Sequence, residues 1–334
     1  MAMATLDEVA RLAGVSRTTA SRAINGGAKV SAKAQQAVDE AVRHLGFTPN
    51  TAARSLASRR TGSVALILPE PDERVFADPF FARALQLVTR YFGEHDRQVV
   101  LLIAQPGEEE QRMLRYLGGR PVDGAVVASH HGSDHLASHL ADIGLPSVFI
   151  GRPWVGADRV TYVDSDNVAA GRRATRVLID RGCRRIAHIA GPADMHAGAD
   201  RLEGWRLELA AAGLATDAVA QGDFTMSGGA SACVALLDAH PDLDGIFAAS
   251  DLMAAGAVRT LTARGRRVPD DVAVTGYDDL GIAEHTDPPL TTMRNPIADM
   301  AAEACRLLLD QMTGTATSPR RVVFVPDLVR RTSA

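Results

Sequence analysis

Beyond residue 62, short apolar runs alternate with longer stretches of helical periodicity, and this alternation strongly limits the possible folds. Strands that alternate with helices form βαβ units around parallel sheets. The pattern occurs in two series, so the sequence predicts an α/β body of two lobes, each with a doubly wound parallel sheet. The expected strands are residues 63–68, 98–103, 124–128, 147–150, 185–190, 245–249, 272–275 and 321–325; the expected helices are residues 80–94, 108–117, 133–143, 167–181, 199–212, 227–239, 252–264 and 297–312.

The two lobes are expected to exchange chain segments. The predicted crossovers are residues 160–164, residues 288–295 and the stretch near Pro319, which are expected to form three hinge strands. The N-lobe is therefore expected at about residues 62–162 and 292–319, and the C-lobe at about residues 163–291 and 320–334. Open parallel sheets bind ligands beyond the carboxyl ends of their strands, so the residues that follow the strands are candidates for a ligand site in the cleft.

Residues 1–49 contain three short helical segments with capping signals. Thr5 and Glu8 have the spacing of a capping box, Ser16 can cap a helix over residues 17–24, and Ser31 can cap another over residues 32–45. The turn of about three residues between the first two segments is typical of a helix-turn-helix, whose second helix enters the major groove of DNA. We therefore expect an all-α helix-turn-helix DNA-binding domain over residues 1–49.

Residues 50–61 are predicted to be a hinge helix and linker. The segment 51–58 is too short to be a stable helix alone, so its folding is expected to depend on DNA, to which nearby arginines offer phosphate contacts. Leu56 belongs to the residue types that wedge between base steps from the minor groove. A simple packing contact is the alternative interpretation of Leu56.

The charge of the chain is unevenly distributed. The whole chain has a net charge of -4, whereas residues 1–60 carry 9 Lys and Arg against 4 Asp and Glu. A basic head on an acidic body indicates that only the head meets a polyanion, although a chance excess on a solvated face would look the same.

Cysteine content and hydropathy favour a cytoplasmic protein. The 3 cysteines, Cys183, Cys233 and Cys305, are far apart and predict neither a disulfide framework nor a zinc ribbon. No apolar run reaches the length of about 18 residues needed to span a membrane, and no export signal precedes the first helix. We therefore expect no membrane partner.

An ordered set of short motifs runs through the chain, and through it the chain resembles transcriptional regulators of the LacI/GalR family over essentially its whole length. The motifs are Thr5-Leu6-Asp7-Glu8-Val9-Ala10, Gly14-Val15-Ser16, Thr19-Ala20-Ser21-Arg22, Asn25, Val30-Ser31, Leu45-Gly46-Phe47-Thr48-Pro49-Asn50, Ala53-Arg54-Ser55-Leu56, Asp78-Pro79-Phe80-Phe81, Asp123-Gly124, Gly151-Arg152-Pro153, Asp166-Asn167, Gly191-Pro192, Arg201-Leu202-Glu203-Gly204-Trp205, Ser250-Asp251, Val268-Pro269-Asp270-Asp271-Val272 and Gly276-Tyr277-Asp278-Asp279.

The resemblance implies a repressor with a periplasmic-binding-protein-like body that binds a near-palindromic, double-stranded operator as a homodimer. It implies base contacts by Arg17, Thr18 and Arg22. Phosphate contacts are implied for Thr5, Ser16, Thr19, Ser21, Asn25 and Ser31, with helix capping as the alternative, and hinge contacts for Asn50, Ala53, Arg54 and Leu56. Arg22 could instead form a surface ion pair. Because the chain ends at Ala334 without a leucine heptad, a dimer is favoured over a tetramer.

The resemblance also implies that a small-molecule effector, a sugar or sugar derivative, controls DNA binding from the cleft. The implied contacts are Phe81, His130, Arg152, Asp166, Arg201, Phe224, Ser250 and Asp278. Arg201 and Asp278 could hold vicinal hydroxyls, and the two phenylalanines could stack on a sugar face. The alternatives are an ion pair across the cleft for Arg201 and core packing for the rings. Met195 and Ala197 replace polar contacts of relatives, and Ser250 stands where Asn is common, so an ordinary hexose is not the expected effector.

Other functions fit the sequence less well. It contains no nucleophile elbow, P-loop or dinucleotide-binding turn, so we expect no catalytic residue and no cofactor. The other candidate sites are a zinc site at His131, His135 and His139, and acid–base pairs at Asp164 and Asp166 or at Asp278 and Asp279. We expect no metal site. Alternatives to a sugar-controlled repressor are an activator, a regulator that responds to a non-sugar metabolite, and a solute-binding protein.

Overall fold

The computed structural model describes residues 4–24, 30–47, 60–105, 107–133, 135–315 and 319–334. The chain divides into two compact units, residues 1–61 and residues 62–334. Each unit has its own hydrophobic core. In the part of the chain that the structure describes, the helices are too short or too polar to cross a membrane.

The first unit consists of α1 (Leu6–Leu12), α2 (Arg17–Ile24) and α3 (Ala32–Leu45), the bounds expected for α2 and α3. Its core contains Val9, Ala20 and Val38, which are fully buried. The capping box is present, since Thr5 accepts a hydrogen bond from the Glu8 amide and Glu8 accepts one from the Thr5 amide. Gly46 ends α3 in the left-handed conformation that glycine tolerates best.

The N-lobe is a six-stranded parallel sheet in the order β11-β5-β4-β3-β1-β2. Alternate residues of β1 point to opposite faces: Leu66 packs against one group of helices, and Ile67 packs against the other. The strands are β1 (Ser63–Leu68), β2 (Gln98–Ile103), β3 (Gly124–Ala128), β4 (Ser147–Ile150), β5 (Thr161–Ser165) and β11 (Arg321–Phe324).

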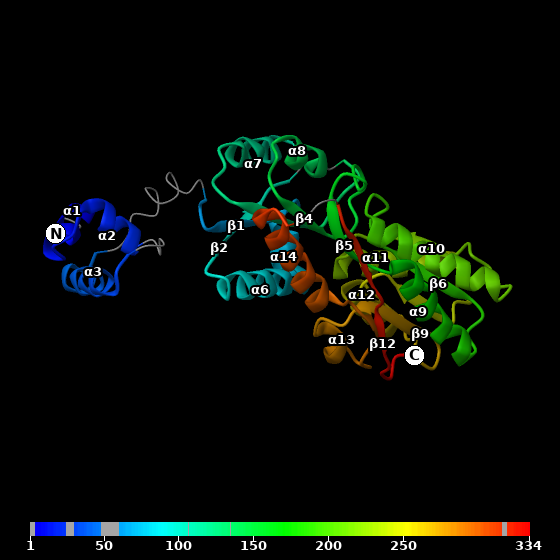
Figure 1. Ribbon diagram of the computed structural model, residues 1–334. Coiled ribbons are helices and arrows are strands. Elements are labelled where there is room, and N and C mark those ends of the chain that lie inside the picture. Colours follow the sequence, from blue (N-terminus) through cyan, green and yellow to red (C-terminus); the bar gives the residue numbers. More distant parts are fainter. Residues whose placement is uncertain (1–3, 25–29, 48–59, 106, 134, 316–318) are drawn as a thin grey trace. The chain divides into compact units, whose positions relative to one another are not determined.

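Helices cover both faces of this sheet (Figure 1). On one face α6 (Pro79–Gly93) and α14 (Ile297–Thr313) pack together, and on the other lie α7 (Glu108–Gly118) and α8 (Leu136–Asp142). The short helix α5 (Asp72–Ala77) precedes α6 and was not predicted. This arrangement leaves the carboxyl ends of β1, β3, β4 and β5 directed toward the C-lobe.

The C-lobe is a second six-stranded sheet in the order β12-β10-β9-β8-β6-β7, parallel except for β12. Its strands are β6 (Ile186–Ala190), β7 (Val219–Gln221), β8 (Gly245–Ala248), β9 (Ala273–Asp278), β10 (Thr291–Arg294) and β12 (Asp327–Val329). The helices α9 (Asn167–Arg181) and α10 (His196–Ala211) pack on one face, and α11 (Met226–Ala239) and α12 (Asp251–Ala263) on the other. The short helix α13 (Ile282–His285) follows β9.

The lobe bounds differ from those expected at three places. Residues 163–165 and Arg321–Phe324 belong to the N-lobe sheet, and Thr291–Arg294 belong to the C-lobe sheet. The chain therefore crosses between lobes after β5, after β10 and after β11. A short apolar run indicates a strand but does not show which of the two sheets the strand joins. For this reason the lobe assignments of residues 163–165, 292–294 and 320–324 were wrong. The short elements β7, β12 and α13 were not predicted.

Candidate functional site

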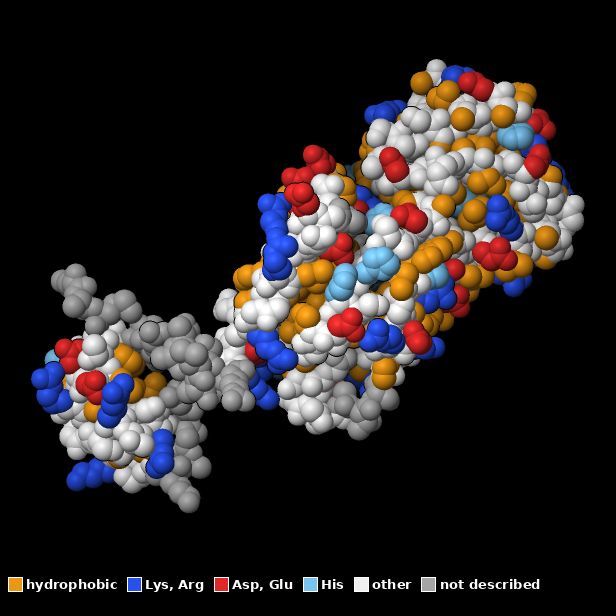
Figure 2. All heavy atoms as spheres, turned by 90° about the horizontal axis from the view of Figure 1, so that it is seen from above, with side chains coloured by type: hydrophobic (Ala, Val, Ile, Leu, Met, Phe, Trp, Pro, Cys, Tyr) orange, Lys and Arg blue, Asp and Glu red, His pale blue; other side chains and the backbone are white. Residues whose placement is uncertain are grey.

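The second helix of the first unit exposes the side chains predicted to read bases. Arg17, Thr18 and Arg22 are exposed, whereas Ala20 and Ala23 are buried in the core. Arg17 lies 3.4 Å from Asp7, with both side chains about two-thirds exposed, so this ion pair holds Arg17 only weakly. Figure 2 shows basic side chains on the surface of this unit.

The predicted phosphate-binding hydroxyls have local structural roles. Ser16 accepts a hydrogen bond from the Thr19 amide and lies 2.8 Å from the Thr19 hydroxyl, and Ser31 accepts one from the Ala34 amide. Thr5, Ser16 and Ser31 therefore cap helices, which is the role that the sequence suggested as the alternative to phosphate binding. Ser21 is half-buried on α2. Asn25, Asn50, Ala53, Arg54 and Leu56 lie outside the described residues.

A pocket of about 110 Å³ lies between the two lobes of the body. This volume is well above the roughly 10–15 Å³ that a cavity needs to hold a single water, so the pocket is open to more than one solvent molecule. The predicted contacts Phe81, His130, Arg152, Arg201, Phe224, Ser250 and Asp278 all line it. Asp166 is not among the lining residues, because it caps α9 and its carboxylate accepts a hydrogen bond from the Ala169 amide at 2.9 Å.

Arg201 is held by partners within the C-lobe. It is 5% exposed, and its Nε and Nη1 atoms donate to the Asn167 side chain at 3.0 Å and to the Ala249 carbonyl at 2.7 Å. The guanidinium group also stacks on the ring of Tyr277 and lies near Phe224. These contacts differ from the alternative of an ion pair across the cleft and leave Arg201 fixed in the pocket wall.

Asp278 and Asp279 follow one another but face different surroundings. Asp278 lines the pocket, and burial raises its pKa to about 7 despite the nearby positive charge of Arg201. Asp279 instead accepts hydrogen bonds from Arg294 at 2.9 Å and from Arg331 at 2.7 Å. Both residues have positive φ angles, 122° and 54°, so the backbone that carries Asp278 needs strong local support.

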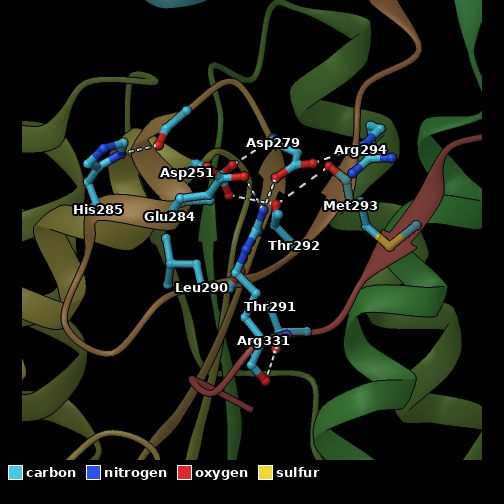
Figure 3. A network of polar contacts seen from close by, with 12 residues as sticks. Asp251, Asp279, Glu284, His285, Leu290, Thr291, Thr292, Met293, Arg294 and Arg331 are labelled. Carbon is cyan, nitrogen blue, oxygen red and sulfur yellow. Dashed lines mark hydrogen bonds and ion pairs between the residues drawn. The ribbon is translucent and has the colours of Figure 1, made fainter.

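A buried polar network supplies that support (Figure 3). Asp251, the first residue of α12, accepts hydrogen bonds from the Thr292 hydroxyl at 2.6 Å and from the Asp279 amide at 2.7 Å. Burial and the neighbouring Asp278 carboxylate raise the pKa of Asp251. With the two arginines on Asp279, the network connects α12, β9, β10 and the C-terminal segment behind the pocket.

The two predicted aromatic contacts both line the pocket and pack in a lobe core. Phe81 is 2% exposed in the N-lobe core, and Phe224 is 7% exposed in the C-lobe core with a positive φ of 64°. The guanidinium of Arg74 lies 5.8 Å from the Phe81 ring centre and 5.5 Å from that of Phe224. The two rings, one from each lobe, therefore both lie beside the same cation.

Arg152 joins the lobes at another wall of the pocket. Its Nη2 donates to Asp200 at 2.6 Å and lies 3.0 Å from the Nδ1 of His196, both on α10. His130 is buried, with its Nε2 3.1 Å from the Ile150 carbonyl oxygen, and Ser250 caps α12 by accepting from the Met253 amide. The pocket wall is therefore built from both lobes and from helix termini.

Several polar pocket residues were not predicted. Arg74, Asp78, Asn167, His196 and Asn295 line the pocket beside the expected contacts. Asp78 caps α6, and burial raises its pKa. Asn295 follows the end of β10, which the sequence indicated only as a crossover strand between the lobes, so the rule that ligands bind after the parallel strands of a sheet was not applied to it. Asp164 also lines the pocket, and burial raises its pKa to about 6.

His131 bridges two carboxylates from different lobes. Its Nε2 lies 3.1 Å from Glu70 in the N-lobe, and its Nδ1 lies 2.8 Å from Asp194 in the C-lobe. The Ser129 hydroxyl donates to Glu70, and Arg74 pairs with the same carboxylate at 2.7 Å. The hydrogen bond to Glu70 raises the pKa of His131. Histidine side chains gather near the middle of the body on the face that Figure 2 shows.

The histidines considered for zinc are arranged differently from a metal site. His131 is occupied by Glu70 and Asp194, while the His135 and His139 rings meet edge to face with centres 6.4 Å apart. Among the residues that the structure describes, no group of three or more His, Cys, Asp or Glu side chains is arranged to hold a metal ion.

The chain is similar to known regulators along its whole length. Residues 5–50 match the family described as bacterial regulatory proteins, lacI family, and residues 175–334 match the periplasmic binding protein-like domain. The chain is 48% identical over 332 residues to the HTH-type transcriptional regulator CelR of Thermobifida fusca, covering 98% of each chain. It is also 33% identical over 311 residues to the ribose operon repressor of Halalkalibacterium halodurans, covering 93% of this chain and 91% of the other.

Solved structures share the same fold. A complex of the transcriptional regulator CelR with cellobiose has 46% identity and a TM-score of 0.80, covering 99% of this chain and 100% of the other. The lac repressor dimer bound to operator and the anti-inducer ONPF has 24% identity and a TM-score of 0.88, covering 99% of each chain. At that lower identity the likeness concerns the fold.

Proposed function

Because the chain belongs to the LacI family of bacterial regulatory proteins and is a DNA-binding transcriptional regulator, we propose that it represses transcription from a near-palindromic operator. Two copies pair through their bodies, so that two helix-turn-helix units meet two half-sites. The fold shared with the lac repressor dimer supports this arrangement. The chain acts in the cytoplasm, where operator DNA is accessible.

Base reading falls to the exposed residues at the start and middle of α2. Arg17 and Arg22 can pair bidentately with guanine, and Thr18 can contact a thymine methyl group or a polar base edge. Ser16, Thr19 and Ser31 lie at the amino ends of α2 and α3, where backbone amides also favour a phosphate. The cap hydroxyls can serve both functions, because a hydroxyl that accepts from the backbone still has a proton to donate.

The effector is an uncharged carbohydrate that binds in the interlobe pocket. The observation that carries this proposal is the combination of Arg201 and Asp278 with the Phe81 and Phe224 rings around one cavity. Charged groups can hold hydroxyls, and rings can cover the apolar face of a pyranose. The first candidate is cellobiose, since the similar regulator CelR forms a complex with it. The apolar Met195 and Ala197 fit the expectation that an ordinary hexose is not the effector.

Effector binding is coupled to DNA binding through the orientation of the lobes. The pocket is lined by both lobes, and the chain crosses between them three times, so a ligand that prefers one arrangement shifts the population of the body toward it. Paired N-lobes then bring the two DNA-binding units together or move them apart. In this proposal cellobiose releases the operator, and the ligand leaves the pocket chemically unchanged.

Fluorescence anisotropy with the promoter DNA of the protein's own gene tests the proposal. We expect saturable binding to a palindromic segment, weakened at least tenfold by cellobiose and little by glucose, ribose or cytidine. Arg201→Ala should bind the same DNA without responding to cellobiose. A protein that binds no segment of that promoter would contradict the repressor proposal, whereas operator binding relieved by a nucleoside would replace only the effector.

A further inference from the structure

We propose that His196 is a specificity-determining residue that donates a hydrogen bond from Nε2 to an uncharged oxygen of the effector, with Arg152 and Trp154 fixing the direction of this donor. This inference rests on the proposed function, in which the pocket holds a carbohydrate. His196 thereby provides a polar contact on the pocket wall where the apolar side chains of Met195 and Ala197 provide none.

His196 stands between those two residues at the first position of α10, and all three line the pocket. Its Nδ1 lies 3.0 Å from the Nη2 of Arg152. A guanidinium group carries only donors, so Nδ1 must accept this hydrogen bond. In a neutral imidazole the single ring proton then resides on Nε2, which makes Nε2 the donor.

The ring is neutral at the pH of the cytoplasm. Burial, together with the positive charge of Arg152, lowers the pKa of His196 to about 4. Within the residues that the structure describes, no protein group accepts from Nε2. A neutral N–H suits a hydroxyl or glycosidic oxygen, whereas a phosphate would be recognised better by a cation.

Trp154 fixes the plane of the ring. The Trp154 and His196 rings are stacked, with centres 4.3 Å apart and planes 27° apart. Asp200 holds the other partner, because it accepts from Arg152 Nη2 at 2.6 Å. With one constraint on Nδ1 and another on the ring face, little rotation of the imidazole remains.

The constraints come from the opposite lobe. Arg152 and Trp154 follow β4 in the N-lobe, whereas His196 begins α10 in the C-lobe. The donor is therefore oriented only when the two lobes have the arrangement seen here. An effector that uses this donor stabilises that arrangement, so the same contact links recognition with the orientation of the lobes.

The matched substitutions His196→Asn and His196→Gln separate the two ring nitrogens. Asparagine can place its oxygen near the Nδ1 position and accept from Arg152, but it offers no donor at the Nε2 position. Glutamine can carry an amide N–H to about the Nε2 position. In calorimetric titrations of the full chain with cellobiose, we expect His196→Asn to raise Kd about tenfold and His196→Gln to stay within about threefold of the parent. Equal Kd values for parent and His196→Asn, or equal losses in both variants, would overturn the inference.

The ring proton can be located directly. Long-range ¹H–¹⁵N NMR of the ligand-free protein, with the His196 signals assigned by their loss in His196→Asn, should show a proton on Nε2 and no titration from pH 8 to 5.5. A proton on Nδ1, or a midpoint near pH 6.5, would contradict the inference. Tighter binding of a phosphorylated cellobiose than of cellobiose would contradict the neutral-donor argument.

These readouts distinguish the inference from the proposed function. If the unaltered protein does not bind cellobiose, the choice of effector fails, and the NMR result still decides whether His196 presents a fixed donor to the pocket. If cellobiose binds and releases DNA but His196→Asn has the affinity of the parent, only the role of His196 fails.

Discussion

The guanidinium carbon of Arg201 lies 3.4 Å from the ring centre of Tyr277, so the charged group lies over the aromatic face. The same arginine donates to Asn167 and Ala249. Lysine has no planar fork with which to make these three contacts together. Arg201→Lys should therefore weaken effector binding by tenfold to a hundredfold, on the order of 1.5–3 kcal/mol, as measured by calorimetry with cellobiose.

Tyr277→Phe is the matched control for this prediction. It keeps the ring under Arg201 and removes only the hydroxyl, which lies 2.5 Å from the Ser165 hydroxyl in the opposite lobe. We expect its effector affinity to fall less than that of Arg201→Lys. Operator affinity without effector should match the parent for Arg201→Lys, and a parallel loss of DNA binding would indicate misfolding instead of a lost ligand contact.

Asp278 makes the stability of the body depend on pH. Its pKa in the folded protein is about 7, above the usual value of 3.8, because the carboxylate is buried. The folded state therefore binds a proton that the unfolded state releases between about pH 4 and 7, so stability falls as the pH rises through this window. Asp251 acts in the same direction, since burial also raises its pKa.

Asp278→Asn should remove this dependence. The amide is similar in shape and carries no charge to bury, so we expect the variant to gain on the order of a few kcal/mol over the parent at pH 8 and little at pH 5. Thermal unfolding at the two pH values measures the difference. A variant that is equally destabilised at both would show that Asp278 acts through its shape and hydrogen bonds instead of its charge.

The contacts of His131 predict that the arrangement of the two lobes depends on pH, in a higher pH window than the stability effect of Asp278. The pKa of His131 is raised above 6.5 by the hydrogen bond to Glu70 and by Asp194, while Arg74 faces the same Glu70 carboxylate. The charged imidazole stabilises the lobe arrangement seen here; this contribution is complete below pH 6.5 and is lost as the pH rises through the folded-state pKa. We therefore expect this arrangement of the lobes to become less populated at higher pH, as measured by small-angle X-ray scattering.

The variants Asp194→Asn and His131→Gln distinguish the pH effect of the His131 bridge from that of Asp278. Both variants remove charge from the contact between the lobes and leave the Asp278 pocket wall in place. We expect each to make the scattering profile independent of pH above 6.5. An unaltered pH dependence in both would assign the change to another group.

The hydrogen bond between Thr292 and Asp251, behind the pocket, is expected to contribute to the stability of the fold. Thr292→Val leaves the buried Asp251 without its hydroxyl donor, which lies at 2.6 Å, so stability should fall by about 1–3 kcal/mol. Thr292→Ser keeps the hydroxyl and should lose less. Gly276→Ala should also destabilise the fold, because an added Cβ would lie 2.2 Å from the Asp251 carboxylate. Chemical denaturation measures all three, and equal stabilities for the Val and Ser variants would contradict the role of the hydroxyl.

The sequence predicted helices, strands and pocket positions better than it predicted which side chains contact one another. Apolar periodicity and caps identified the helices of the first unit because these signals are local. The pocket contacts came from a family resemblance, and Asp166 was the exception because its carboxylate is used to cap α9. The bridge from Glu70 through His131 to Asp194 could not be foreseen, since it joins residues more than 60 positions apart in two lobes.

Ser16 allows helix capping and DNA contact to be measured separately. Its hydroxyl accepts from the Thr19 amide at 3.1 Å, which Asn and Asp can also do, whereas Ala cannot. Ser16→Ala should therefore destabilise the first unit by about 1 kcal/mol, and Ser16→Asn and Ser16→Asp should not. Thermal unfolding of the full chain, followed through the helical signal, gives this comparison.

If Ser16 also contacts a phosphate, the two cap-preserving variants should differ on DNA. Ser16→Asp places a negative charge near the phosphate backbone of the DNA and should weaken operator binding at least tenfold relative to Ser16→Asn. The difference should be largest at low salt, where the electrostatic repulsion is least screened. Anisotropy titrations at two salt concentrations would show this difference narrowing as salt rises. Equal affinities at both concentrations would mean that Ser16 acts on DNA binding only through the helix it caps.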